Sequence, residues 1–403
     1  MQFKKRKSAW DARGSRVSFQ RLGQRNSRWW GPLKRLAQLA LLGFVIFAFI
    51  CLAPLARAVV VCRIFNPAEE TEPPAAAPPE AVQNAISRLE GYTRREDSTY
   101  LKLPEWYIVY SAEEYAAFIQ NNPPSRFPYF EAVGQFWESY FSLCAATVDR
   151  YSYNNEDQVV NMVIGVSFAA EYYAKGAYEV TLGRLSEWLS GNAQTEEDVF
   201  AQKVAAEYGA FLHTIPWYDF PFAARLGEMW RTTGWWGPNV LRKWERKLAL
   251  TAEYGVKAIY GWFIGGSARA SLAQPLLITY AWAENFPDAA RDAPEVEVTA
   301  EFGEDGVMLA LPRYEGFAVA VPQLAAAGVR FVQIAGNDEI MLTVLAPRTW
   351  AYDLSAGEVL FAQPILTDAN LQRLAINVPV NELHAVLNEL DEREFALEHI
   401  YDY

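Results

Sequence analysis

The chain has 403 residues, enough for two or three domains with a sizeable buried core. Hydrophobic residues make up 51% and charged residues 21%, which excludes a chain that is disordered throughout. Three cysteines exclude a disulfide-dense secreted scaffold, and three histidines leave little material for a histidine-rich metal site. We therefore expect neither a metal ion nor another cofactor.

The net charge of −12 hides two regions of opposite sign. Residues 1–35 carry eleven Lys or Arg against one acid, Asp11, which leaves 25 basic and 47 acidic residues in 36–403. So acidic a body repels phosphates over most of its surface, which argues against a nucleic-acid partner.

An uncharged stretch follows the basic segment. Residues 36–53 contain one Gln and no charge, and with Pro54–Ala56 they are long enough to cross the ~30 Å of hydrocarbon in a bilayer. We predict a transmembrane helix over 36–56, with basic residues 1–35 in the cytoplasm and the rest exported. The charge order favours a single-pass protein of a bacterial inner membrane with a periplasmic C-terminal domain, although a eukaryotic type II protein has the same order.

The alternative is a cleaved signal peptide, because Ala56-Arg57-Ala58 has the small-x-small pattern of a cleavage site. The long basic segment, the long apolar run and Arg57 within the site argue against cleavage. Residues 57–80 then form a Pro/Ala/Glu-rich linker. Cys51 and Cys62 lie in or beside one helix, too far apart to bond to each other, and Cys144 reads as an unpaired core residue.

Residues 81–286 are expected to form an aromatic-rich helical domain. Apolar residues recur at three- and four-residue spacing through most of it. Residues 103–111 are the exception and are predicted to be a short strand, and the last helix is predicted over 269–284. The apolar segment 254–283 contains Lys257 and Arg269, so a buried helix pair or an interfacial hairpin is favoured over a second membrane crossing.

Residues 217–247 combine tryptophans with lysines and arginines inside an acidic body. This mixture suits a lipid headgroup region, where rings bury their apolar part and cations meet phosphates. The predicted membrane contacts are Trp230, Trp235, Trp236, Arg242, Lys243 and Trp244. The competing interpretation is ordinary core packing of the aromatic rings.

In residues 287–403 the spacing of apolar residues changes from three or four residues to every second residue. This alternation predicts an α+β domain with an antiparallel sheet. The eight candidate strands are 296–302, 307–311, 317–321, 330–335, 340–346, 358–363, 374–378 and 395–401. Gly336-Asn337-Asp338 is expected to turn a hairpin. A weak repeat pairs 318–322 with 375–379 as strand–Pro–helix–strand units, which suggests a ferredoxin-like topology. The overall fold class expected is α+β.

The nucleophile candidate is Ser167, whose context Gly165-Val-Ser167-Phe-Ala169 approaches the Gly-x-Ser-x-Gly elbow of hydrolases. His213, His384 or His399 would have to supply the base. Glu171, Lys175 and Tyr178 share one face of the same predicted helix with Ser167. That face either lines a cleft that binds a polar ligand or is a solvated stripe of ion pairs.

The preferred function is non-catalytic. We expect a membrane-anchored protein that contacts lipid and whose extracytoplasmic part binds another protein or itself. The alternative is a serine-dependent hydrolase that uses Ser167.

Overall fold

The structure is a computed structural model that describes residues 27–65, 78–271, 277–293 and 295–403. Its contacts divide the chain into two units, Met1–Ala53 and Pro54–Tyr403. Much of the predicted basic segment, the Pro-rich part of the linker at 66–77, and residues 272–276 of the predicted last helix lie outside the described residues.

The apolar helix predicted over 36–56 is present within α1 (Ser27–Val61). Its stretch Ala37–Val61 is long and apolar enough to cross a membrane. Because the helix continues to Val61, residues 57–61, expected as linker, are its last turn and belong to the folded body.

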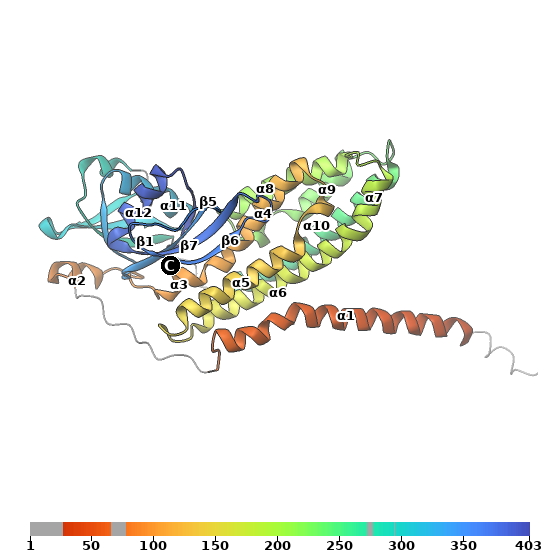
Figure 1. Cartoon of the computed structure of the whole chain (residues 1–403), viewed down its shortest axis with the longest axis horizontal. Coiled ribbons are helices and arrows are strands. Elements are labelled where there is room, and N and C mark those ends of the chain that lie inside the picture. Colours follow the sequence, from red (N-terminus) through yellow and green to blue (C-terminus); the bar gives the residue numbers. More distant parts are fainter. Residues whose placement is uncertain (1–26, 66–77, 272–276, 294) are drawn as a thin grey trace, which may run out of the picture. The chain divides into compact units, whose positions relative to one another are not determined.

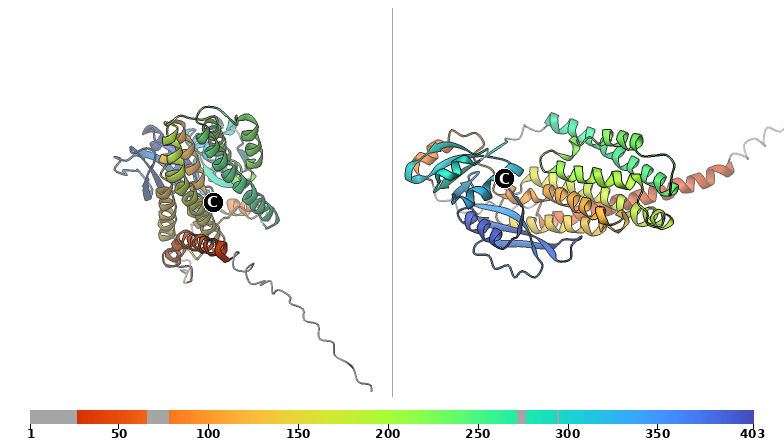
Figure 2. Two further views of the ribbon diagram at one scale, coloured as in Figure 1. Left: turned by 90° about the vertical axis from the view of Figure 1, so that its right-hand side faces the viewer. Right: turned by 90° about the horizontal axis from the view of Figure 1, so that it is seen from above.

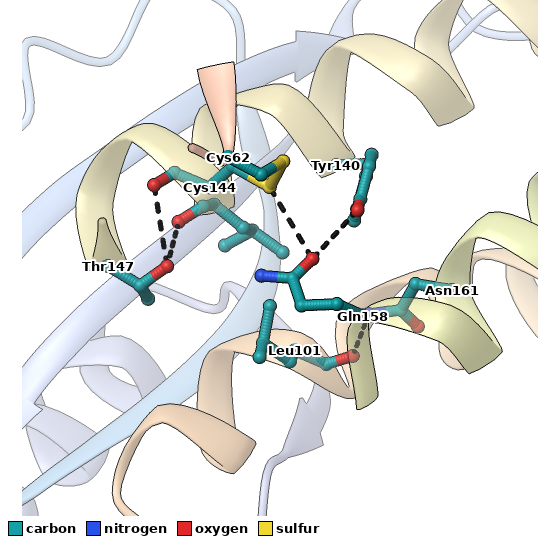
Figure 3. Close-up of a disulfide and its surroundings, with 8 residues drawn as sticks. Cys62, Leu101, Tyr140, Cys144, Thr147, Gln158 and Asn161 are labelled. Atoms are coloured by element: carbon teal, nitrogen blue, oxygen red, sulfur yellow. Dashed lines mark hydrogen bonds between the residues drawn. A yellow bond between two sulfur atoms is a disulfide. The ribbon is translucent and has the colours of Figure 1, made fainter. Parts of the chain in front are cut away.

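A disulfide joins Cys62 to Cys144, so the expectation of an unpaired Cys144 is wrong (Figure 3). The two cysteines are 82 residues apart in sequence, and only the packing of Cys62 beside α5 (Tyr129–Thr147) brings them together. Cys51 is a free cysteine, and it is not bonded to Cys62, as expected.

The middle of the body is helical, as predicted; most of its helices form a bundle to one side of the sheets, while the first two lie beside the sheets (Figures 1 and 2). The helices are α2 (Glu80–Ile86), α3 (Asp97–Leu101), α4 (Leu103–Asn121), α5, α6 (Asn155–Tyr178), α7 (Arg184–Leu189), α8 (Glu196–Leu212), α9 (Phe222–Thr232) and α10 (Val240–Ser271). A π-helical segment, Glu179–Gly183, joins α6 to α7.

Two local expectations are wrong. Residues 103–111 are the start of α4, not a strand, because Pro104 sits in the first helical turn and the aromatic residues that follow are buried by tertiary packing. The predicted helix over 269–284 is divided: α10 ends at Ser271, and Ile278–Glu284 form strand β1. Apolar periodicity could not separate a short buried strand from a helix there.

The C-terminal part holds two antiparallel four-stranded sheets rather than one. The first has the order β2-β3-β1-β4 and the second β6-β7-β5-β8. The remaining strands are β2 (Glu297–Glu301), β3 (Val307–Pro312), β4 (Arg330–Ile334), β5 (Glu339–Pro347), β6 (Glu358–Pro364), β7 (Leu371–Pro379) and β8 (Ala396–Ile400). Helix α11 (Glu315–Ala326) follows β3, and α12 (Leu383–Glu392) follows β7.

The two sheets have the same topology: in each, the second, third, first and fourth strands lie in that order, with a helix between the third and fourth. The predicted repeat is thus present, but its alignment is wrong, because 318–322 lie in α11 and not in a strand. The hairpin predicted at Gly336 is also wrong, since β4 and β5 belong to different sheets. Each sheet contains a split β–α–β unit, while a single ferredoxin-like sheet is not confirmed.

Two cores hold the sheets and the helices in one unit. Apolar side chains of both sheets, α11 and α12 form one cluster. A second cluster joins α3 and α4 to the second sheet, where Trp106 and Tyr110 pack with Met341 and Tyr401. Helices α3 and α4 are therefore packed against the second sheet and connect it to the remaining helices.

Candidate functional site

Helix α10 directs its basic residues into the protein. Arg242, Lys243, Arg246 and Lys247 have side chains that are at most 5% exposed. They face the first turn of α8, where Glu196, Glu197 and Asp198 follow the capping residue Thr195. Acidic residues favour a helix N-terminus, so this turn is a local source of carboxylates for the cations.

These groups form a buried ion-pair network. Arg246 Nη1 lies 2.8 Å from Glu179 Oε1, and its Nε lies 3.2 Å from Asp198. Lys247 Nζ lies 2.9 Å from Glu197, and both side chains are 0% exposed. The remaining pairs join Arg242 to Glu187, Asp198 and Glu245, and Lys243 to Glu196 and Glu197.

The structure thus separates the predicted lipid contacts into two groups. Arg242 and Lys243 point into the network, so their charges are not presented at the surface of the folded protein. Trp230, Trp235 and Trp244 pack together with ring centroids 5.6–6.1 Å apart. Trp236 is 78% exposed and Trp235 is 54% exposed. Of the predicted lipid contacts, Trp235 and Trp236, which lie in the turn before α10, are the ones exposed at the surface.

A second charged cluster lies where α6 and α10 run side by side. Lys175 Nζ lies 2.9 Å from Glu253, and Lys257 Nζ lies 2.7 Å from Glu171. Burial alone would raise the pKa of Glu253, but Lys175 and Lys257 outweigh it and lower that pKa to about 2. The pKa values of both lysines are raised in turn by these carboxylates despite burial.

The four charges border a cavity of about 60 Å³. Seven aromatic residues line it: Tyr115, Tyr129, Phe168, Tyr172, Tyr208, Phe222 and Tyr254. Lys175 lies 4.0 Å from the ring centroid of Tyr115, and Lys257 lies 4.9 Å from that of Tyr208. Because each cation already has a carboxylate and a ring, a ligand that pairs with either lysine would have to displace one of these partners.

The predicted polar stripe is only partly brought together. Glu171 and Lys175 line the cavity, as the cleft interpretation required, whereas Tyr178 is hydrogen-bonded to Glu245 beyond it. Glu253 and Lys257, the partners from α10, were not among the site residues predicted from the sequence. The available signal was their four-residue spacing, which places both on one face of a helix.

Ser167 lies in the middle of α6, and not at a strand-to-helix turn. Its Oγ is 3.1 Å from the hydroxyl of Tyr260. His213 instead contacts Glu113 and Glu315, and His399 stacks on Trp106. In the described part of the chain no histidine is hydrogen-bonded to Ser167, so the arrangement does not resemble a catalytic triad.

A histidine–tryptophan cluster was also missed. The rings of His399 and Trp106 are stacked with centroids 3.5 Å apart, and His213 meets the same tryptophan edge-on. Burial, together with the charge of His213, lowers the pKa of His399 well below its usual value. Among the described residues, no group of three or more His, Cys, Asp or Glu is placed to hold a metal ion.

Comparisons of the chain with protein-family models, with curated proteins and with solved structures gave no match. Its function must therefore be argued from its own residues.

Proposed function

We propose that the chain is a single-pass protein of a bacterial inner membrane, with residues 1–35 in the cytoplasm and the body in the periplasm. The body acts as a non-catalytic module that binds another protein or a second copy of itself. The observation that carries the topology is the Cys62–Cys144 disulfide, which begins one residue after the apolar stretch Ala37–Val61. Disulfides persist in oxidising compartments such as the periplasm and are rare in the cytosol.

Ion pairs also hold the segment next to the disulfide. Arg57 lies 3.0 Å from Glu138 and packs over the ring of Phe141, and Arg63 lies 2.6 Å from Asp149. These exposed ion pairs are weak individually. Together with the disulfide they hold residues 57–63, which include the end of α1, against α5 within the body.

Saturation of the buried charges supports a binding role over a catalytic one. General acid–base catalysis needs a group whose proton can reach a substrate, whereas the network and cavity charges are held in ion pairs. Binding surfaces are available on the outside. Strand β2 is a sheet edge with exposed Glu297 and Glu301, and Trp235 and Trp236 are exposed for contact with lipid headgroups.

Thiol labelling in intact cells tests the topology. In the full-length Cys51→Ala variant, the two remaining cysteines are those of the disulfide. After acid trapping, a maleimide-polyethylene glycol reagent should add no mass without reductant and two increments after reduction. A C-terminal alkaline phosphatase fusion should be active, and a green fluorescent protein fusion should be dark. Two increments without reductant, together with a fluorescent fusion, would place the body in the cytoplasm.

Chemical cross-linking of native membranes followed by mass spectrometry tests the binding role. The expected result is a reproducible cross-link from the body to one partner or to a second copy. Labelling of Ser167 by a fluorophosphonate, lost in Ser167→Ala, would instead favour the hydrolase.

A further inference from the structure

The outward face of α10 is apolar over most of the helix. Between Leu241 and Gly266, none of its exposed side chains carries a charge, although this stretch contains seven charged residues. The exposed residues are Leu241, Leu248, Ala252, Val256, Ile259, Tyr260, Trp262, Phe263 and Gly266. The helix is therefore inverted relative to one on the surface of a water-soluble protein, with charges inside and apolar groups outside.

The neighbouring segment α6–α7 has the same polarity. Its exposed residues from 159 to 189 are Val159, Val160, Val163, Ala174, Ala177, Thr181, Leu182, Arg184, Leu185, Trp188 and Leu189. Its inward side instead carries Glu179 and Glu187, which are buried. The exposed charges in these two stretches of α6–α7 and α10 are thus few: Arg184, and the side chain of Glu171, which is 39% exposed and paired with Lys257.

The two faces lie next to each other. The pairs Glu171–Lys257 and Lys175–Glu253 show that α6 and α10 run antiparallel in contact (Figure 1). The exposed hydrogen bond between Ser167 and Tyr260 lies on the line where they meet. We call the exposed residues listed above for both segments the apolar face. Patches of this extent mark an interaction surface.

We propose that the apolar face is embedded in the outer leaflet of the membrane to which α1 anchors the chain, with its residues in contact with lipid acyl chains. This rests on the anchoring in the proposed function and extends it. From Leu241 to Phe263, α10 rises about 33 Å, at ~1.5 Å per residue. That length is sufficient for a helix lying in the membrane plane to bury one long side.

The face is one-sided, which favours this arrangement over a bundle that crosses the membrane. The exposed residues of α8 include Glu196 and Lys203, and those of α5 include Glu131 and Glu138. A crossing bundle would need an apolar surface on all sides. A body with lipid on one side and water on the other needs one apolar side and one charged side, and the body has both.

Charge and aromatic content favour lipid over a second copy of the chain. Arg184 suits anionic headgroups, whereas a second copy would bring the same cation, and the partly exposed Glu171 is already paired with Lys257 of its own chain. Trp188 and Trp262 are 73% and 70% exposed on this face, and tryptophan is enriched at membrane interfaces. The anchor also keeps the bilayer at high effective concentration.

Site-specific fluorescence on the full-length chain tests the proposal. Single cysteines replace Leu248 or Val163 on the apolar face, or Ala206 on α8 as the water-exposed control, in the Cys51→Ala background with the native disulfide intact. Each is labelled with a nitrobenzoxadiazole dye in nanodiscs of phosphatidylethanolamine and phosphatidylglycerol. Doxyl-labelled lipids should quench the dye at 248 and 163 and leave it at 206, while iodide should quench only at 206.

Iodide quenching at 248 and 163 equal to that at 206 would show that the face is in water and overturn the proposal. Protection from both quenchers would show a protein on the face, and disulfide formation between two Leu248→Cys chains would identify it as a second copy. Loss of the chain from the nanodisc fraction would instead contradict the anchoring. A chain that stays in the nanodisc but fails the quenching test refutes only the lipid-embedded face.

Discussion

Lys175, Lys257 and Glu253 show how single residues hold charges inside the helical part. Glu253 accepts a hydrogen bond from Lys175 at 2.9 Å and lies 3.9 Å from Lys257. A buried ion pair need not add net stability compared with apolar residues of the same shape. Removing one partner is costly all the same, because the other charge stays buried without compensation.

Glu253→Gln should therefore lower the free energy of unfolding by about 3–5 kcal/mol. The measurement is chemical denaturation of the full-length protein in detergent. Glu131→Gln, on the exposed side of α5, is the control and should change stability by less than about 0.5 kcal/mol. Adding Lys175→Met to Glu253→Gln should recover part of the loss. If the Glu253→Gln protein were as stable as the control, the buried charges of the two lysines would not need this carboxylate for compensation.

His213 should make stability depend on pH. Burial alone would lower its pKa, but the carboxylates of Glu113 and Glu315 outweigh it and raise that pKa above the usual value. A histidine whose pKa is raised in the folded state contributes its full stabilisation at a pH below its unfolded pKa of about 6.5. This contribution is lost as the pH rises through the pKa of the folded state. The stability difference between wild type and His213→Gln should be larger at pH 6 than at pH 8. A difference that grows with pH would contradict the assigned ion pairs.

At the scale of elements, glycine sets the distance between α5 and α6. A Cβ on Gly165 would lie 2.5 Å from Phe136 Cε1 and 2.7 Å from the ring of Trp137. Both rings are buried, so the helices can approach this closely only because position 165 has no side chain.

Gly165→Ala should destabilise the protein by about 1–3 kcal/mol, because buried rings and backbone must shift. Gly134→Ala on α5 is the matched control, since a Cβ there meets nothing within 4 Å. That substitution should stabilise by about 0.5–1 kcal/mol through the better helix propensity of alanine. Thermal denaturation of both variants is the measurement, and a shift of the same sign in both would refute the close-packing argument.

The whole body, 54–403, is one structural unit in which the helices depend on the sheets. Arg373 on β7 contacts Glu398 on β8 at 2.6 Å and Glu114 on α4 at 2.9 Å. The core formed by α3 and α4 is completed by residues of β5 and β7. Each part also has a core of its own, so the shared core is the contact that couples them.

Hydrogen exchange should consequently show the body opening as one unit. We expect the most protected amides of α5 and of β5 to exchange with the same free energy of opening, because their cores are shared. A chain truncated after Ser271 should fail to form a stable fold, as judged by rapid proteolysis. A stable truncated helical part would contradict the shared core.

Several features follow from the sequence alone. The uncharged run of residues 36–53 specifies a membrane-length helix, because length and hydropathy are local properties. Helical periodicity likewise predicted most of the helices between 81 and 266, and alternation predicted strands in the C-terminal part. These patterns depend only on residues close together in the sequence, so they can be recognised without knowing the fold.

Tertiary structure decided the rest. The sequence of α10 shows an amphipathic helix, but periodicity does not say which face is inside, and here the acidic first turn of α8 attracts the cationic face inward. The Cys62–Cys144 disulfide, the Glu253–Lys175 pair and the helical state of residues 103–111 depend on segments distant in the chain. Their energies come from burial and charge pairing across that distance, which no local pattern encodes.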